Sequence, residues 1–283
     1  MFLEVTEFLS NALPDFAVRF FEVFTMLGEQ YALIAFMGMF YWCIDKKRGQ
    51  FIALSVVSSL CLNNFAKNVF RVRRPFEVSG KVRVTRKNTA TGHSFPSGHT
   101  QNAGAAAFSA ARGCKNKSAY VVAAVYVLLI GLSRLVLGVH YITDVLGGIL
   151  FAFVGVYLAE GAEKLASRKG QEYLLVLAVL PVLSAVSVFI KGAQSHDALT
   201  SAGIALGAII GIVVERKYIN FDVQGTKIKK IIRFTGGFAF VVLIMYLLKL
   251  ILADNGVCRL IRYAIIGFTA TAAIPYLFKK IKL

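Results

Sequence analysis

The chain has 283 residues, 57% of them hydrophobic and 17% charged, and its mean hydropathy is +0.66. Soluble globular domains are less apolar than this, so the composition excludes that class. Apolar runs near the ~20 residues that a helix needs to cross a bilayer recur along the chain and predict an all-α, polytopic transmembrane bundle. The net charge of +17 would suggest a nucleic-acid partner for a soluble protein. Here Lys and Arg cluster between apolar runs, where they set membrane topology, and we expect no such partner.

Residues 1–15 predict a helix that lies at the membrane interface. Positions 2–13 are amphipathic, with the apolar members Phe2, Leu3, Val5, Phe8 and Leu9. The segment is acidic, with Glu4, Glu7 and Asp15, and it has no basic n-region. We therefore expect no cleaved signal peptide.

About nine membrane spans follow in chain order. We predict them at residues 18–43, 50–70, 98–112, 118–137, 140–160, 172–190, 198–214, 234–253 and 260–278. The third is short and rich in Gly and Ala, which is typical of a helix buried among others. The four cysteines are scattered, in a pattern that suits neither a disulfide framework nor a zinc site.

The basic residues predict the orientation of the chain in the membrane. More than half of the 32 Lys and Arg residues fall in alternate connections, within residues 46–48, 112–117, 164–169, 216–233 and 279–282. The positive-inside rule places these connections in the cytoplasm. The N-terminus is then outside and the C-terminus inside, as expected for an integral protein of a bacterial plasma membrane.

Charged and polar residues gather in one region of this apolar chain. They are Lys67, Arg74, Pro75, Pro96, Ser97, Gly98, His99, Ser133, Arg134, His140 and Asp144. Residues 96–99 would open a helix, so backbone N–H groups, the Ser97 hydroxyl and the helix dipole would point at an anion, and Gly98 would allow close approach. Lys67, Arg74 and Arg134 would neutralise a phosphoryl group, with the guanidinium groups able to clamp it bidentately.

Two histidines are available for phosphoryl transfer. His140 and Asp144 are four residues apart at the predicted start of the fifth span, so we expect them to share one helical face. Asp144 could then accept the Nδ1 proton of His140 and make it a better nucleophile. His99, which comes from another helix, is free to act as general acid and later as base on water.

These residues resemble, at every defining position, the three-part signature of the type 2 phosphatidic acid phosphatase superfamily. The resemblance implies that His140 is the phosphorylated nucleophile, that Asp144 supports it and that His99 is the general acid. It implies phosphate binding by Lys67, Arg74, Ser97, Gly98 and Arg134, without a metal or other cofactor. It also implies a six-helix core, which we place at residues 16–191. The last three spans lie outside this core, and we assign residues 192–283 to a C-terminal transmembrane extension of about three helices.

The resemblance leaves several alternatives open. The substrate is expected to be a lipid phosphate or diphosphate, such as undecaprenyl diphosphate, phosphatidic acid or phosphatidylglycerophosphate, reached from the non-cytoplasmic side. A phosphotransferase with the same site, a glucose-6-phosphatase-like enzyme and a non-enzymatic lipid transporter are the other candidates. A metal at His99, His140 and Asp144 is disfavoured because three cations surround them. Glu29, in the first span, either borders the cavity or forms an ion pair between helices, and the sequence does not indicate an oligomeric state.

Overall fold

The computed structural model describes residues 2–114, 116–193 and 195–283, and this part of the chain folds into helices joined by loops, without a strand. The α-helices are α1 (Phe2–Ala12), α2 (Asp15–Thr25), α3 (Gln30–Met39), α4 (Lys46–Phe70), α5 (Pro75–Val78), α6 (Gly98–Arg112), α7 (Ser118–Val136), α8 (Ile142–Lys169), α9 (Val179–Val186), α10 (Ser195–Val214), α11 (Lys227–Ile251), α12 (Gly256–Phe268) and α13 (Ile274–Lys280). Short 3-10 or π segments are η1 (Met26–Gly28), η2 (Phe40–Ile44), η3 (Lys87–Thr89), η4 (Gln171–Ala178), η5 (Ser187–Phe189), η6 (Glu215–Ile219) and η7 (Thr269–Ala273).

Seven helices among the described residues are long and apolar enough to cross a membrane. An eighth candidate is the pair formed by α2–η1 and α3–η2, which is bent by 50° at Glu29. The remaining predicted span is α6, whose 15 residues would reach only about 22 Å, short of the ~30 Å hydrocarbon core. Its start lies inside the bundle, because Asn63 of α4 donates to the carbonyl of Pro96 at 3.1 Å.

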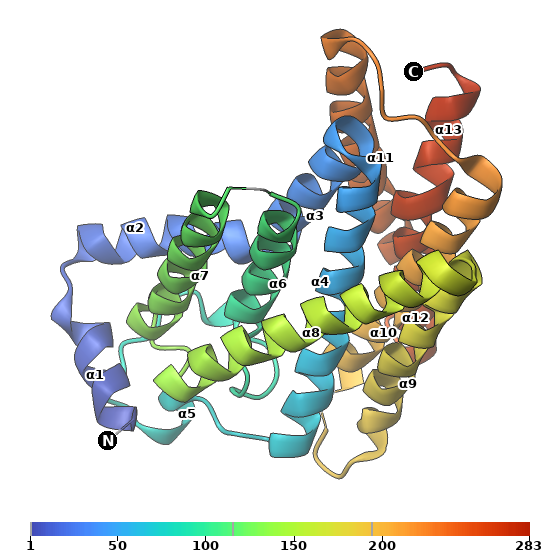
Figure 1. Ribbon diagram of the computed structural model, residues 1–283. Coiled ribbons are helices and arrows are strands. Elements are labelled where there is room, and N and C mark those ends of the chain that lie inside the picture. The colour runs from blue at the N-terminus through green and yellow to red at the C-terminus, as the bar shows by residue number, and fades with distance from the viewer. Residues whose placement is uncertain (1, 115, 194) are drawn as a thin grey trace.

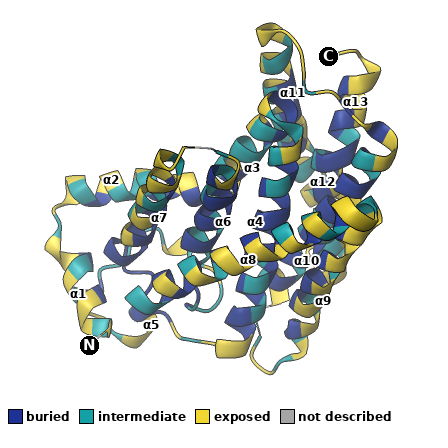
Figure 2. Ribbon diagram, viewed as in Figure 1, coloured by how far each residue is buried: buried dark blue, intermediate teal, exposed yellow. Residues whose placement is uncertain are grey.

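The helix α4 runs through the middle of the bundle and packs against α6, α8, α9 and α10 (Figure 1). It is buried along most of its length, as are the inner faces of α6 and α10 (Figure 2). The N-terminus and α5 lie at the lower end of the bundle in Figure 1, and the C-terminus lies at the upper end. The two ends of the chain are therefore on opposite sides of the structure.

Small residues let these helices approach closely. A Cβ atom on Gly155 of α8 would come within 2.9 Å of Ser59 Cβ on α4. A Cβ on Gly207 of α10 would lie 2.0 Å from the carbonyl oxygen of Ala264 on α12. Such contacts are typical of helix packing in membranes, where dispersion and backbone proximity replace the hydrophobic drive of water.

The last three long helices are not separate from the rest of the chain. Tyr41 in η2 donates its hydroxyl to the carbonyl of Thr271 at 2.5 Å, and Trp42 Nε1 donates to the carbonyl of Ala270 at 3.2 Å. Both aromatic side chains are buried in a cluster with residues of α12 and α13. The first span thus packs directly on the C-terminal extension.

Large apolar side chains are exposed on the outer faces of the helices, including Phe16 and Phe20 on α2 and Phe189 in η5. On α1 the polar Thr6 and Ser10 are buried while Phe8 is exposed. An outward apolar surface of this extent on long apolar helices identifies an integral membrane protein.

Candidate active site

The predicted site residues converge where α4 ends, where α6 and α8 begin, and where α7 turns into α8. His140 lies in that last turn and is almost completely buried. Its Nδ1 atom is 3.1 Å from Oδ2 of Asp144, and the same oxygen accepts from the backbone N–H of Tyr141 at 2.8 Å. The expectation that both residues lie on one helical face is wrong in detail, because α8 begins only at Ile142. The contact forms because the turn brings the imidazole over the first residues of α8.

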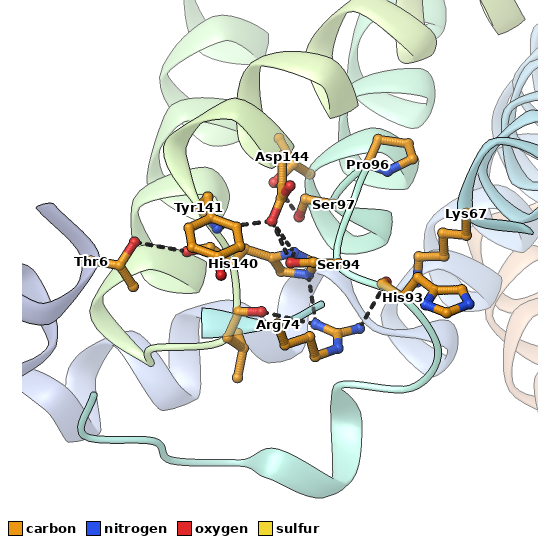
Figure 3. A network of polar contacts seen from close by, with 12 residues as sticks. Thr6, Lys67, Arg74, His93, Ser94, Pro96, Ser97, His140, Tyr141 and Asp144 are labelled. Atoms are coloured by element: carbon orange, nitrogen blue, oxygen red, sulfur yellow. Dashed lines mark hydrogen bonds and ion pairs between the residues drawn. The ribbon is translucent and has the colours of Figure 1, made fainter. Parts of the chain in front are cut away.

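Contacts on both sides of the His140 ring define its tautomer. Arg74 Nη1 lies 3.3 Å from Nε2, as Figure 3 shows. A guanidinium group can only donate, so Nε2 must be the acceptor and Nδ1 carries the proton that faces Asp144. Burial lowers the pKa of His140 well below its ordinary value, and the nearby cations Arg74 and Arg134 lower it further. The imidazole is therefore neutral, with its lone pair on Nε2.

Arg74 is buried and also holds the loop that precedes α6. Its Nη2 donates to the carbonyl of Thr91 at 2.6 Å, its Nε to Gly92 at 3.0 Å, and its Nη1 to Val139 at 2.9 Å. Lys67, one helix turn from the end of α4, donates to the carbonyl of Thr91 at 3.2 Å. Two of the predicted phosphate-binding cations therefore also position the backbone around His140.

Ser97 and Gly98 form the start of α6, as predicted. Ser97 is the N-cap residue, and its backbone N–H donates to the carbonyl of Asp144 at 2.9 Å, which ties α6 to α8. Its hydroxyl lies 2.9 Å from the Thr100 hydroxyl. A Cβ on Gly98 would approach Oδ1 of Asn63 at 3.4 Å, so the backbone is closely packed here.

Several buried polar atoms of the site have no hydrogen-bond partner among the described residues. Arg134 donates from Nη1 to the Thr25 hydroxyl at 2.9 Å, but its Nε and Nη2 atoms are unpaired. Nε2 of His99 and Oδ1 of Asp144 are also buried without a hydrogen bond. Unsatisfied buried groups are rare in folded proteins, and here two guanidinium donors, an imidazole and a carboxylate oxygen share one region.

Two family models match the chain. The PAP2 superfamily matches residues 49–161, and the transmembrane extension of PAP2 superfamily phosphatases matches residues 199–283. The chain belongs to the PAP2 superfamily. Together the two matches contain every site residue discussed so far except Thr25.

Curated relatives cover part of this PAP2 chain. Phosphatidylglycerophosphatase B of Bacillus subtilis is 35% identical over 88 residues, which are 28% of this chain and 43% of that protein. Sphingosine-1-phosphate phosphatase 2 of Homo sapiens is 29% identical over 144 residues, 49% of this chain and 36% of the relative. The chain thus spans less than half the length of either. No solved structure matches it.

Ser94 is a site residue that the sequence analysis missed. It is fully buried, and its hydroxyl donates to Oδ2 of Asp144 at 2.5 Å and lies 3.4 Å from Nδ1 of His140 (Figure 3). In the sequence, only its position two residues before Pro96 could have indicated a role in the site. No helix or strand periodicity relates Ser94 to Asp144. In this PAP2 site, Asp144 therefore accepts from Ser94 as well as from His140.

The described residues contain no group of three His, Cys, Asp or Glu side chains that could hold a metal ion. His140 contacts the carboxylate of Asp144, and the positive charges of Arg74, Arg134 and Lys67 act on it. In chemical terms this PAP2 site is arranged for an anion, with one histidine held by a carboxylate and a second histidine close by.

Proposed function

We propose that the chain is a membrane-embedded phosphatase that hydrolyses a lipid phosphomonoester through a phosphohistidine on His140. One observation carries this proposal: among the described residues, Arg134 and His99, whose charges act on His140, have buried nitrogen atoms without hydrogen-bond partners. A phosphoryl group has acceptor oxygens for the Arg134 donors and an ester oxygen for His99. Binding such a group would satisfy atoms that are costly to leave unpaired.

In the first step, Nε2 of His140 attacks phosphorus and the bond between phosphorus and the ester oxygen breaks. His99 gives its proton to that oxygen, so the lipid leaves as an alcohol. Asp144 keeps the Nδ1 proton of His140 in place and stabilises the positive charge that develops on the ring. Lys67, Arg74 and Arg134 balance the charge on the phosphoryl oxygens, and the start of α6 at Gly98 adds the positive end of its helix dipole.

In the second step, His99 accepts a proton from water and the resulting hydroxide attacks phosphorus. The bond between phosphorus and Nε2 of His140 breaks, phosphate leaves, and both histidines return to their starting states. No metal takes part in this scheme, because three cations carry out the charge neutralisation.

The proposed substrate class is a lipid phosphomonoester. The names of the Bacillus subtilis and Homo sapiens relatives both describe enzymes that act on monoesters of lipids. The exposed apolar side chains of α1 and α2, such as Phe8 and Phe16, lie on the helices beside the site and suit lipid chains. The alternative substrates are a lipid diphosphate and a soluble sugar phosphate, and the assay below distinguishes them from a lipid phosphomonoester.

We also propose that the site faces the non-cytoplasmic side of a plasma membrane, with the N-terminus outside and the C-terminus inside. Lys46 begins α4 and Lys67 lies near its end, about 32 Å apart at ~1.5 Å per residue. Lys46 lines a cavity of about 780 Å³ with Arg112 and Lys164, among other residues. This basic end suits the cytoplasmic surface. Residues 16–191 would be the core and residues 192–283 an extension packed on it.

The test is phosphate release by the purified, detergent-solubilised protein. The panel contains phosphatidylglycerophosphate, sphingosine 1-phosphate, phosphatidic acid, undecaprenyl diphosphate and glucose 6-phosphate, each with and without EDTA. The proposal expects the lipid monoesters to be hydrolysed fastest, with no loss on chelation. No release from any lipid substrate would refute it. Preference for the diphosphate or for glucose 6-phosphate would refute the substrate class, and loss of activity with EDTA would refute the metal-free scheme.

A further inference from the structure

A second carboxylate lies beside the second histidine. Glu29 stands at the break between η1 and α3, and its Oε1 atom is 3.9 Å from Nε2 of His99. Both side chains are mostly buried, and in the described part of the chain Nε2 of His99 has no hydrogen-bond partner. A separation of 3.9 Å is within the range of an ion pair but too long for a hydrogen bond. Contacts of this kind tighten when the histidine is protonated in the substrate complex.

The same carboxylate oxygen has a second partner. Arg86, in the loop between α5 and α6, donates from Nη2 to Oε1 of Glu29 at 2.5 Å. The loop is thereby fastened to the first span on the side of His99. Glu29 thus forms an ion pair with an arginine of a loop, where the sequence analysis offered a pair between helices. The same oxygen also faces the histidine that would supply the proton.

Positive charges act on His99, so the Glu29 carboxylate affects whether His99 can hold a second proton. His99 is subject to the positive charges of Arg134 on α7 and Lys67 on α4, and Arg86 lies behind Glu29. All of these oppose a proton on the imidazole. Glu29 supplies a negative charge that counters them. A proton on His99 in the substrate complex would therefore depend on this carboxylate to offset burial and the cations.

On the basis of the proposed phosphatase function, we infer that Glu29 is the positioning residue of the general acid, holding Nε2 of His99 so that Nδ1 faces the leaving oxygen. The arrangement mirrors that of the nucleophile, in which Asp144 holds Nδ1 of His140 and leaves Nε2 free. When the ester bond breaks, the Nδ1 proton of His99 passes to the alcohol oxygen, and Glu29 retains the Nε2 proton. Glu29 touches neither the substrate nor the phosphoryl group.

The test uses the dependence of a general acid on its leaving group. An alkoxide must be protonated as it leaves, whereas 4-nitrophenolate leaves as a stable anion. We compare kcat/KM, which reports the first chemical half of the reaction, for a lipid phosphomonoester and for 4-nitrophenyl phosphate. For Glu29→Gln we expect a loss of about 100-fold with the lipid, in line with the value of general acid catalysis, and a loss below about 3-fold with the aryl ester.

Asp15→Asn is the matched control. Asp15 is also an acidic residue of the N-terminal segment paired with an arginine of the same loop, Arg83 at 2.6 Å, and its described ion pair does not involve His99. This variant should keep both activities. In a His99→Ala background, Glu29→Gln should cause no further loss with the lipid, because the two side chains act as one unit.

Glu29→Asp gives an independent check should Glu29→Gln fail to fold, since it keeps the charge but withdraws it by one methylene. It should show a smaller loss that is again confined to the lipid substrate. Equal losses with both substrates, or no loss with either, would overturn the inference. These results differ from a failure of the proposed function, in which the wild-type protein itself would release no phosphate from the lipid.

Discussion

Arg74 Nη1 lies 3.3 Å from Nε2 of His140, so the atom proposed to attack phosphorus is covered by a cation. The other donors of Arg74 are used by the carbonyls of Thr91 and Gly92. The same guanidinium therefore shapes the loop and selects the tautomer of His140. A bound phosphoryl group would take its place between the two side chains.

Arg74→Lys should reduce kcat/KM for a lipid phosphomonoester about 100-fold, the cost of removing one charge-stabilising donor from a site of this kind. An ammonium group cannot reach three carbonyls and the imidazole from a single planar frame. Steady-state phosphate release measures the effect. Arg73→Lys is the control, since Arg73 is exposed and bonds only to the carbonyl of Glu77 among the hydrogen bonds described. Equal activity of the two variants would contradict the role given to Arg74.

Ser94→Ala should lower kcat about 10-fold while leaving KM unchanged, because Asp144 loses a donor and holds His140 less firmly. The free energy of unfolding should fall by about 1–3 kcal/mol, as for a lost hydrogen bond to a buried charged group. Kinetics and thermal unfolding in detergent check both numbers. Ser109→Ala on α6 is the matched control, since this buried serine bonds to carbonyls of its own helix. A Ser94→Ala enzyme with normal kcat would show that Asp144 does not need this contact.

His140→Ala should abolish turnover and also prevent transfer of labelled phosphate from substrate to protein. Wild-type protein quenched during turnover should carry label that is lost in acid, as a phosphohistidine is. Labelling that persists in His140→Ala would assign the nucleophile to another residue.

Asp144→Asn should keep substrate binding but lower kcat by orders of magnitude, as loss of an orienting carboxylate does in other hydrolytic sites.

The acidic limb of the kcat/KM profile should lie below pH ~6.5, the ordinary pKa of histidine. Burial lowers the pKa of His140, and the charges of Arg74 and Arg134 add to this effect. A lowered pKa means that the neutral nucleophile persists as the pH falls. Arg74→Gln removes one of these charges and should move the limb to higher pH. An acidic limb above pH ~6.5 in the wild type would mean that His140 is not the group that titrates.

Gly207→Ala should destabilise the protein by about 1–3 kcal/mol, because the new methyl group would meet the carbonyl of Ala264 on α12. Gly161→Ala, on α8, has no atom within 4 Å of the new Cβ and should be neutral or slightly stabilising. Thermal unfolding in detergent compares the two. Similar melting temperatures for both variants would mean that α10 and α12 can separate without cost.

The signature residues and the spans could be predicted from the chain alone, for different reasons. A span is a local property, because about 20 apolar residues are needed to cross the hydrocarbon core wherever they occur. The signature residues could be predicted because the order and spacing of Lys67, Arg74, His99 and His140 are read directly from the sequence. The start of α8 at Ile142, two residues after His140, could not be predicted because helix boundaries respond to their surroundings.

The contacts that complete the site were decided by tertiary structure. Ser94 meets Asp144 across 50 residues, and Glu29 meets His99 from another helix. Neither pair has a spacing rule, because each depends on how two helices cross and on where the loop between them lies. The short length of α6 was expected from the sequence, but the hydrogen bond from Asn63 to Pro96 before its start depends on how α4 packs beside it. The sequence alone determines which chemical groups are present and where apolar runs can span a membrane. The partners of each side chain depend on how distant segments pack, and only the tertiary structure decides them.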